Sequence, residues 1–178
     1  DCGPATIAIS QDVQGESFDY PEAFFEERVH EIRRIHPDLN QVKVAAEKLK
    51  NSKQPIIISG GGVLYSEAEE ELSHFAKKHN IPVTATAMGI GCMTKDDPYY
   101  IGGIGGLGER SANNLSKETD LAIAIGTKLA DFTTGSWANF ENSNFKLVSL
   151  NTARHDTSKH LATPVICDAK IGLKQLSE

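Results

Sequence analysis

Glycine-rich loops have the clearest capacity for chemistry in this chain, because glycine lets backbone amides approach a phosphate group closely. The segments IIISGGG at residues 56–62 and LAIAIGTKLADFTTG at residues 121–135 each join an apolar run to such a loop, and IGGIGGLG at residues 101–108 lies between them. Loops that follow the strands of a parallel sheet form the ligand crevice of nucleotide-binding folds. We therefore predict a nucleotide-type crevice. Its candidate binding residues are Gly60, Gly61, Gly62, Gly105, Gly108, Lys128 and Asn151.

Gly103, Gly105 and Gly108 match the spacing GxGxxG, which lets the backbone approach a dinucleotide pyrophosphate at a helix N-terminus. That motif normally follows a strong strand, whereas the preceding segment KDDPYYIG contains a proline, two aspartates and few apolar residues. A close-packed glycine loop is the expected structure here. Residues 60–62 do follow an apolar run, and for them an anion site and a simple turn of the chain both stay open.

Polar side chains follow the apolar run at residues 121–125. Lys128, Asp131, Thr133 and Thr134 stand where the phosphates or hydroxyls of a ligand would reach them, and Asn151 has the same position after LVSL. Loops at strand ends often carry function. A hydrated loop whose side chains cap the neighbouring backbone explains these residues equally well.

No catalytic residue and no metal ligand are predicted. His155, Asp156 and His160 have the residue types of metal ligands, but they stand in one polar run without a second cluster to complete a site. The remaining histidines lie in charged helical or linker stretches. No serine or cysteine stands in a recognisable set with a histidine and an acid.

Composition sets the class of protein. A chain of 178 residues is long enough for one domain of ordinary size. No apolar run approaches the ~18 residues of a membrane span, and a net charge of −6 with dispersed basic residues disfavours nucleic acid. Cys2, Cys92 and Cys167 form no CxxC pair, so they predict reduced thiols of a cytoplasmic protein.

Helices and strands alternate along the chain, as an α/β fold requires. Val42, Ala45 and Leu49 share one face of a helix predicted over residues 40–51. Ser66 and Glu69 have the capping-box spacing, which predicts a helix from Ser66 to about residue 79. The other expected elements are strands at 56–59, 82–86, 121–125, 147–150 and 164–166, a helix at 109–115, a left-handed stop at Asn80 and a closing helix capped by Asp168. Continuous apolar strands between helices predict a three-layer, Rossmann-like parallel sheet with helices on both faces.

The first forty residues differ in character from the rest. Residues 5–10 have the apolar content of a strand, and PEAFFEERVHEIRR at residues 21–34 fits either a helix or an extended linker. We expect residues 1–14 to be the last strand of a preceding domain, residues 15–39 a linker and residues 40–178 the α/β domain. Because the sequence opens directly on a strand, we interpret it as an excised fragment.

Taken in order, the segments GPATIAISQDVQ, IIISGGGV, IGGIGGLGERSANN and LAIAIGTKLADFTTGS resemble the thiamine-diphosphate enzymes related to acetolactate synthase. The resemblance covers the whole chain. In that family a pyrimidine-binding domain, a linker and a Rossmann-like central domain precede the diphosphate-binding domain. The resemblance therefore implies that this chain holds the end of the first domain, the linker and the central domain.

Within the family, the linker YPEAFFEERVHEIRR and the loop DFTTGS are most similar to the hydrolases of myo-inositol catabolism, which open the ring of a trihydroxycyclohexane-dione by C–C bond hydrolysis. This implies thiamine diphosphate and magnesium as cofactors of the full-length enzyme, a cyclic diketone as its small-molecule substrate and a homo-oligomer, dimer or tetramer. The family's activating glutamate belongs before Asp1, and no Gly-Asp-Gly magnesium motif occurs in the sequence. The isolated chain is therefore expected to be structural and inactive.

Flavin-binding members of the family hold FAD in the central domain with loops that resemble GxLGxHG and GARFDDR. In this chain Leu107 stands where the histidine would be, and Lys128, Ala130 and Phe132 replace Arg, Asp and Arg of the second loop. These departures make FAD doubtful and favour a crevice that serves packing and assembly. Two alternatives stay open: the central domain of an acetolactate synthase-like decarboxylating enzyme, and a self-standing FAD- or NAD-type nucleotide-binding module.

Overall fold

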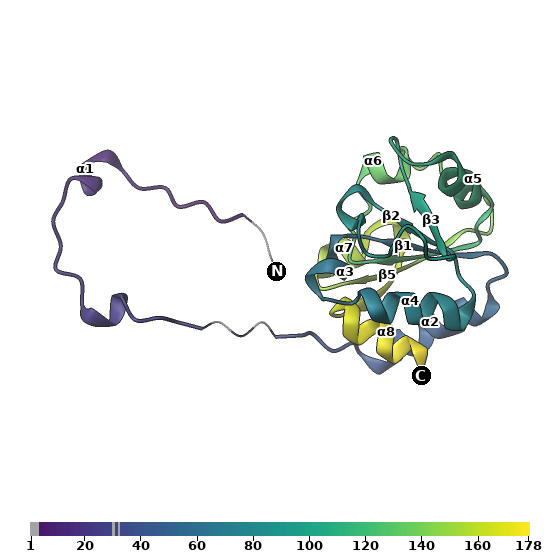
Figure 1. Ribbon diagram of the computed structural model, residues 1–178, viewed down its shortest axis with the longest axis horizontal. Coiled ribbons are helices and arrows are strands. Elements are labelled where there is room, and N and C mark those ends of the chain that lie inside the picture. The colour runs from purple at the N-terminus through teal and green to yellow at the C-terminus, as the bar shows by residue number, and fades with distance from the viewer. Residues whose placement is uncertain (1–3, 30, 32) are drawn as a thin grey trace. The chain divides into compact units, whose positions relative to one another are not determined.

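The computed structural model describes residues 4–29, 31 and 33–178. Contacts between residues divide the chain into two units, Asp1–Arg33 and Arg34–Glu178. The second unit is built on one six-stranded sheet in the order β3-β2-β1-β4-β5-β6, in which every pair of neighbouring strands is parallel (Figure 1). The strands are β1 (Pro55–Ser59), β2 (Val83–Ala85), β3 (Tyr100–Gly103), β4 (Leu121–Ile125), β5 (Lys146–Asn151) and β6 (Thr163–Ile166). This order places β1 and β4 side by side at the centre.

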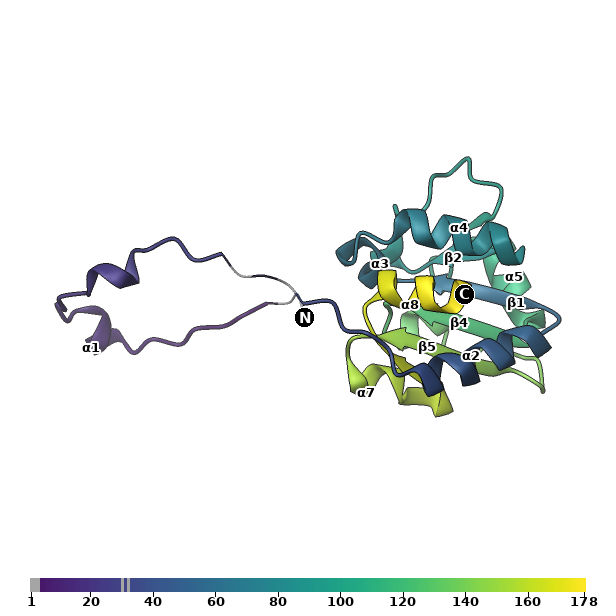
Figure 2. The same ribbon diagram turned by 90° about the horizontal axis from the view of Figure 1, so that it is seen from below.

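Helices cover both faces of the sheet, which confirms the predicted three-layer α/β fold. Figures 1 and 2 show α2, α4 and α8 together on one side, and Figure 1 shows α5 and α6 on the other. The longer helices of the second unit are α2 (Leu39–Asn51), α4 (Glu69–His79), α5 (Arg110–Glu118) and α8 (Ala169–Ser177). Shorter helical segments are α3 (Gly61–Tyr65), η2 (Ala87–Gly89), α6 (Asp131–Thr134), α7 (Arg154–Thr157) and η3 (Lys159–Leu161). Among the described residues, no helix is long and apolar enough to cross a membrane.

Two hydrophobic cores lie on opposite faces of the sheet, because successive side chains of a strand point to opposite sides. Ile57 of β1 and Ile123 of β4 join the core beneath α2, α4 and α8. Ile56 and Ala124 join the second core, against which Trp137 and other aromatic side chains pack. All five residues of β4 are buried, as expected for a central strand of a parallel sheet.

Several local predictions are confirmed. The predicted helix at residues 40–51 is α2, and its apolar Val42 and Ala45 are buried. Asn80 adopts the left-handed conformation (φ 53°, ψ 49°) that ends α4. The Asp168 carboxylate accepts hydrogen bonds from the amides of Lys170 (3.0 Å) and Ile171 (3.2 Å) and so caps α8.

Two expectations around the glycine loops are wrong. Ser66 is the C-cap of α3 and does not begin α4, whose N-cap is Ala68 without a side-chain hydrogen bond. The capping-box spacing failed because a helix already begins at Gly61, directly after β1. The weakly apolar segment before Gly103 does form a strand, β3, which pairs with β2 at the edge of the sheet. An edge strand needs fewer apolar residues than a central one, which explains why its sequence pattern is weak.

The second unit begins at Arg34, and the boundary of the α/β domain expected at residue 40 stays a prediction. The guanidinium of Arg34 donates to the carbonyl of Ser66 (2.6 Å) and forms an ion pair with Asp168 (3.0 Å). The backbone carbonyl of Ile35 also accepts a hydrogen bond from the Asp168 amide (2.9 Å). These contacts fix the segment before α2 to the start of α8.

The described residues of the first unit contain little regular structure. The strand expected at residues 5–10 is not formed, and the unit contains α1 (Gln11–Gln14) and η1 (Glu22–Phe24). The reason is that a single strand has no stability without a partner strand. Aromatic rings pack on one another here, with centroids 4.8 Å apart for Tyr20 and Phe24. The assignment of residues 1–14 to a preceding domain stays a prediction.

The outer margin of β6 has its own hydrogen-bonding arrangement. The Cys167 amide, just after β6, donates to the Asn151 carbonyl of β5 (3.1 Å). Alternate residues of a strand direct their backbone nitrogens to opposite sides. The backbone nitrogens of Pro164 and Ile166 therefore point away from β5. Proline has no N–H group, and the Ile166 amide donates to the side-chain oxygen of Gln41 in α2 (3.0 Å).

Candidate functional site

The carboxyl ends of the strands gather the residues predicted to form a crevice. Chain connections run in opposite directions from β1 and β4, and in open α/β sheets ligands bind where this reversal occurs. The glycines at residues 60–62 follow β1, Lys128 lies in the loop after β4, and Asn151 ends β5. The glycine loop at residues 103–108 follows β3, at the edge of the same sheet.

The loops after β1 and β4 are in direct backbone contact. A Cβ atom added to Gly60 would lie 2.4 Å from the Gly126 carbonyl oxygen, and one added to Gly62 would lie 2.5 Å from the Gly126 Cα. The amides of Gly60 and Gly62 donate to the carbonyls of Ile125 (2.8 Å) and Gly126 (2.9 Å). Glycine is therefore required for close approach of two loops, and these two amides hold the loops together.

The loop after β3 is also tied to the protein itself. Gly105 has a φ of +108°, and the side chain of Asn113 both accepts from its amide and donates to its carbonyl, each at 3.0 Å. The Gly108 amide donates to the Gly105 carbonyl (2.8 Å). A side-chain nitrogen of Asn139 donates to the same Asn113 oxygen (3.1 Å). This arrangement supports the expected close-packed glycine loop.

Asn151 and Lys128 have different environments. The side chain of Asn151 donates to the carbonyl of Thr127 (3.2 Å) and accepts from the amide of Ala153 (3.0 Å), so it joins the loops after β4 and β5. Lys128 is exposed, while the neighbouring Leu129 is buried with a φ of 48°. Among these predicted residues, Lys128 is the one whose charged group is directed to solvent.

The polar residues around α6 form hydrogen bonds with one another. The hydroxyl of Ser136 donates to the Asp131 carboxylate (3.2 Å), and that of Thr134 donates to the Asp131 carbonyl (3.1 Å). Further along the chain, the Asp156 carboxylate forms an ion pair with Lys159 (2.5 Å). His160 packs against Trp137, with ring centroids 4.3 Å apart. The described residues contain no group of three or more His, Cys, Asp or Glu side chains arranged to hold a metal ion.

A buried serine and a buried cysteine lie beneath the loop after β1. Burial raises the pKa of the Cys92 thiol, and the neighbouring Ser59 side chain and backbone amides only partly oppose this effect. The Ser59 hydroxyl has no hydrogen-bond partner among the described residues. Neither side chain is exposed. Cys92 therefore lacks the low pKa and the access that a reactive thiol needs.

The structure adds residues at this edge that the sequence pattern did not indicate. Tyr65, Met88, Leu107 and Phe132 are large apolar side chains left exposed; we refer to these four as the apolar edge surface. Met88 and Tyr65 both lie within 3.6 Å of a Cβ built on Gly61. Asn113, which holds the β3 loop, was also missed. Only the folded chain brings these scattered residues to one edge.

The fold and this edge define the class: a Rossmann-like domain whose carboxyl-edge loops pack on one another. The family model described as "Thiamine pyrophosphate enzyme, central domain" matches residues 42–176, and the chain belongs to that family. The resemblance inferred from the sequence is thereby confirmed.

Two related proteins show which members of the family this chain resembles. The chain is 43% identical over 178 residues to the 3D-(3,5/4)-trihydroxycyclohexane-1,2-dione hydrolase of Geobacillus thermodenitrificans, covering 100% of this chain and 28% of that protein. It is 43% identical over 175 residues to the protein of the same name from Clostridium tetani, covering 98% and 27%. The chain thus spans little more than a quarter of the length of these relatives.

A solved structure from Mycobacterium smegmatis, described as that of a thiamin diphosphate-dependent enzyme, has the same fold. It superimposes with a TM-score of 0.65 at 19% sequence identity, covering 84% of this chain and 29% of that chain. At this identity the likeness supports the fold alone.

Proposed function

We propose that this chain is the central part of a thiamine-diphosphate-dependent hydrolase that opens the ring of 3D-(3,5/4)-trihydroxycyclohexane-1,2-dione in myo-inositol degradation. One observation carries the proposal: the 43% identity to the hydrolase of Geobacillus thermodenitrificans extends over 100% of this chain. The similarity therefore includes residues 1–41, which lie outside the match to the central-domain family model.

The role proposed for the chain itself is architectural. Its carboxyl-edge loops use the Gly60, Gly62 and Gly108 amides for internal hydrogen bonds, which supports a packing role. When bound to the whole enzyme, thiamine diphosphate supplies the carbanion that attacks a ring carbonyl. We propose that the cofactor, its magnesium ion and the catalytic groups are bound outside this chain. Titration calorimetry of the isolated chain tests this, because saturable binding of thiamine diphosphate with magnesium at a thiamine site would contradict it.

A nucleotide at the crevice is the second proposal, and the loops give it little support. FAD is doubtful because Leu107 is 90% exposed and Phe132 is 63% exposed where hydrogen-bonding side chains would be needed. Lys128 is the one charged side chain of the predicted set that is free to meet a phosphate. Melting curves with FAD, NAD, ADP and coenzyme A provide the test, since a ligand at 100 times its Kd adds about 2.7 kcal/mol of stability. A rise in the melting temperature with any of the four would favour the nucleotide-binding alternative.

Self-association is proposed on the apolar edge surface. Four large apolar side chains left open to solvent at one edge are typical of a surface that meets another protein surface. In the whole enzyme this surface would be covered by neighbouring parts or by a second copy in a dimer or tetramer. Sedimentation of the isolated chain is expected to show association, and a monodisperse monomer would count against the proposal.

The decisive assay uses a full-length enzyme that carries this chain, supplied with thiamine diphosphate and magnesium and offered the cyclohexane-dione beside pyruvate. Ring opening without release of CO2 is the expected result. Release of CO2 from pyruvate without ring opening would favour an acetolactate synthase-like decarboxylating enzyme. Replacing the corresponding quarter of the Geobacillus hydrolase by this chain gives a second test, because a chimera that binds thiamine diphosphate but opens no ring would contradict the proposal.

A further inference from the structure

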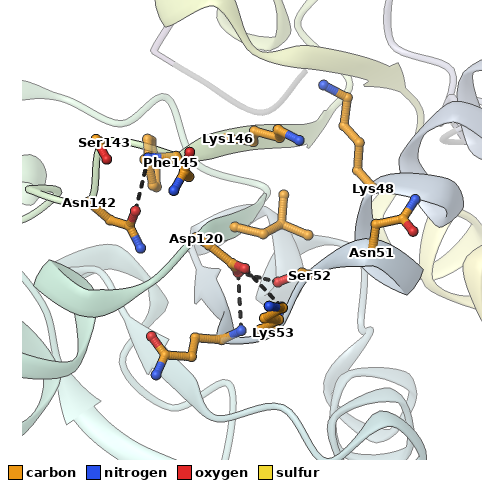
Figure 3. A pocket seen from close by; sticks show the side chains of 12 residues that line it. Lys48, Asn51, Ser52, Lys53, Asp120, Asn142, Ser143, Phe145 and Lys146 are labelled. Atoms are coloured by element: carbon orange, nitrogen blue, oxygen red, sulfur yellow. Dashed lines mark hydrogen bonds between the residues drawn. The ribbon is translucent and has the colours of Figure 1, made fainter.

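A hollow of about 830 Å³ lies at the amino-terminal ends of β1, β4 and β5, the edge of the sheet opposite the glycine loops (Figure 3). The end of α2 forms one side of it. Its volume falls within the range of small-molecule pockets, which is roughly 300–1,000 Å³. None of the residues predicted from the sequence to bind a ligand lines it.

Three lysines line this hollow, which we call the basic hollow: Lys48 from α2, Lys53 before β1 and Lys146 at the start of β5. Figure 3 shows the side chains of Lys48 and Lys146 extending from opposite sides toward the open space. Within the described part of the chain, none of the three ammonium groups lies within 4.0 Å of a carboxylate. Three unpaired cations therefore gather at one place in a protein of net charge −6.

Asp120 is the one acidic residue that lines the basic hollow, and its carboxylate is already occupied. It accepts hydrogen bonds from the Ser52 hydroxyl and from the amides of Lys53 (2.8 Å) and Gln54 (3.1 Å). Burial pushes the pKa of Asp120 upward, but these hydrogen bonds outweigh it and hold the pKa below its usual value. The carboxylate thus stays ionised, fixes the loop before β1 and makes no ion pair with the lysines.

Among the groups that line the basic hollow, the positive charges outnumber the negative ones. The last carbonyls of α2 add a partial negative charge of about one half, and Asp120 adds one full negative charge. Three lysines exceed this sum. Side-chain amides on the rim hold the walls in place, since Asn142 donates to the Glu118 carbonyl (2.9 Å) and accepts from the Asn144 amide (2.9 Å).

We propose that the basic hollow binds a small phosphorylated molecule, with Lys48 and Lys146 contacting the phosphate oxygens from opposite sides. A phosphate group carries close to two charges at neutral pH and three acceptor oxygens, so one group satisfies two lysines at once. Because the hollow lies at the amino edge of the sheet, a ligand there leaves the carboxyl-edge crevice free. The binding itself does not rest on the proposed function, whereas a role of the ligand as an effector of the enzyme does.

Titration calorimetry of the whole 178-residue chain with sodium pyrophosphate at low ionic strength tests the inference. Saturable binding is expected, weakened about tenfold by Lys48→Gln and about tenfold by Lys146→Gln, since each removes a hydrogen bond to a charged group. Lys43→Gln is the matched control: it lies on the same helix, is exposed, removes the same charge and does not line the hollow. Binding in the control is expected to change less than about twofold, because its charge is screened from the ligand.

Two results would overturn the inference: no saturable heat with pyrophosphate, or equal weakening by Lys43→Gln and Lys146→Gln. Citrate binding as tight as pyrophosphate would refute the phosphate class, since citrate presents carboxylates alone. Thermal melts confirm that the variants fold. Substitution of the exposed Lys43 or Lys146 is expected to change the stability by less than about 0.5 kcal/mol, and substitution of the half-buried Lys48 by about 1 kcal/mol or less. Thiamine diphosphate also carries phosphate groups, so it is titrated into the double variant Lys48→Gln/Lys146→Gln as well. Binding at the basic hollow should be lost in this variant, whereas binding at a separate thiamine site would persist.

Discussion

Replacement of Gly62 by alanine tests the contact between the loops after β1 and β4. The added Cβ would lie 2.5 Å from the Gly126 Cα, whereas ordinary van der Waals contact begins at 3.4 Å. The nearest atoms all belong to the backbone of Gly126 and not to a flexible side chain, so the two backbones must move apart. That movement stretches the hydrogen bond from the Gly62 amide to the Gly126 carbonyl, now 2.9 Å long, and the one from the Gly60 amide.

The expected loss of stability follows from these changes. Overpacking costs about 1–3 kcal/mol, and each weakened backbone hydrogen bond contributes about 0.5–1.5 kcal/mol. Alanine in α3 returns at most about 1 kcal/mol, because it fits a helix better than glycine does. We expect Gly62→Ala to lower the free energy of unfolding by about 2–3 kcal/mol, which shifts the urea midpoint down by about 1 M.

Urea unfolding followed by the fluorescence of Trp137, the one tryptophan, measures this change. Gly103→Ala is the matched control, because its Cβ would meet nothing closer than the Ala85 carbonyl oxygen at 3.7 Å. We expect the control to stay within about 0.5 kcal/mol of the unaltered chain. Gly126→Ala should be worse than Gly62→Ala, because Gly126 also has a φ of +60°. Equal stability of Gly62→Ala and Gly103→Ala would refute the reasoning.

Other groups allow further tests. Asp168→Ala removes the α8 cap and the partner of Arg34, and is expected to cost about 2–4 kcal/mol in urea unfolding; Asp168→Asn keeps the cap and should cost less, so equal losses would mean that the cap contributes nothing. Burial, together with nearby positive charge, lowers the pKa of His79, which favours the neutral ring in the folded chain. Stability should therefore be complete above about pH 6.5 and fall as the pH drops below it; a slope unchanged in His79→Leu would place its origin elsewhere. Burial raises the pKa of Cys92 and raises that of Cys167 to about 12, so both thiols should resist iodoacetamide at pH 8 until urea unfolds the chain; rapid labelling of the corresponding peptides by mass spectrometry would contradict their burial.

The sequence was most informative where local chemistry decides the structure. The stripe from Val42 to Leu49 indicated α2, the five apolar residues of β4 indicated a buried strand, and Asp168 indicated the start of α8. Each depends on residues close together in the chain. The attachment of Arg34 to α8 could not be predicted in this way, because its ion pair with Asp168 joins residues far apart in the sequence.

The candidate site was predictable in position but not in detail. Gly60 and Gly62 were expected to turn the chain tightly or to face an anion, and both uses place glycine at the same positions. The hydrogen bonds of their amides to β4 and its loop depend on how two strands pair, which glycine spacing alone does not reveal. The basic hollow was missed for a related reason: Lys48 and Lys146 line the same hollow only because the fold brings the end of α2 near the start of β5.

The outer margin of β6 bears on how copies of this protein can meet. An open strand at the end of a sheet offers a row of N–H groups on which another chain can build, and repeated addition gives aggregates. In β6 two backbone nitrogens point outward, and neither can donate to another chain. That of Pro164 carries no hydrogen, and that of Ile166 already donates to the Gln41 side chain. A second molecule finds no donor there with which to continue the sheet. Finite assemblies are thereby favoured over fibres on this side of the domain.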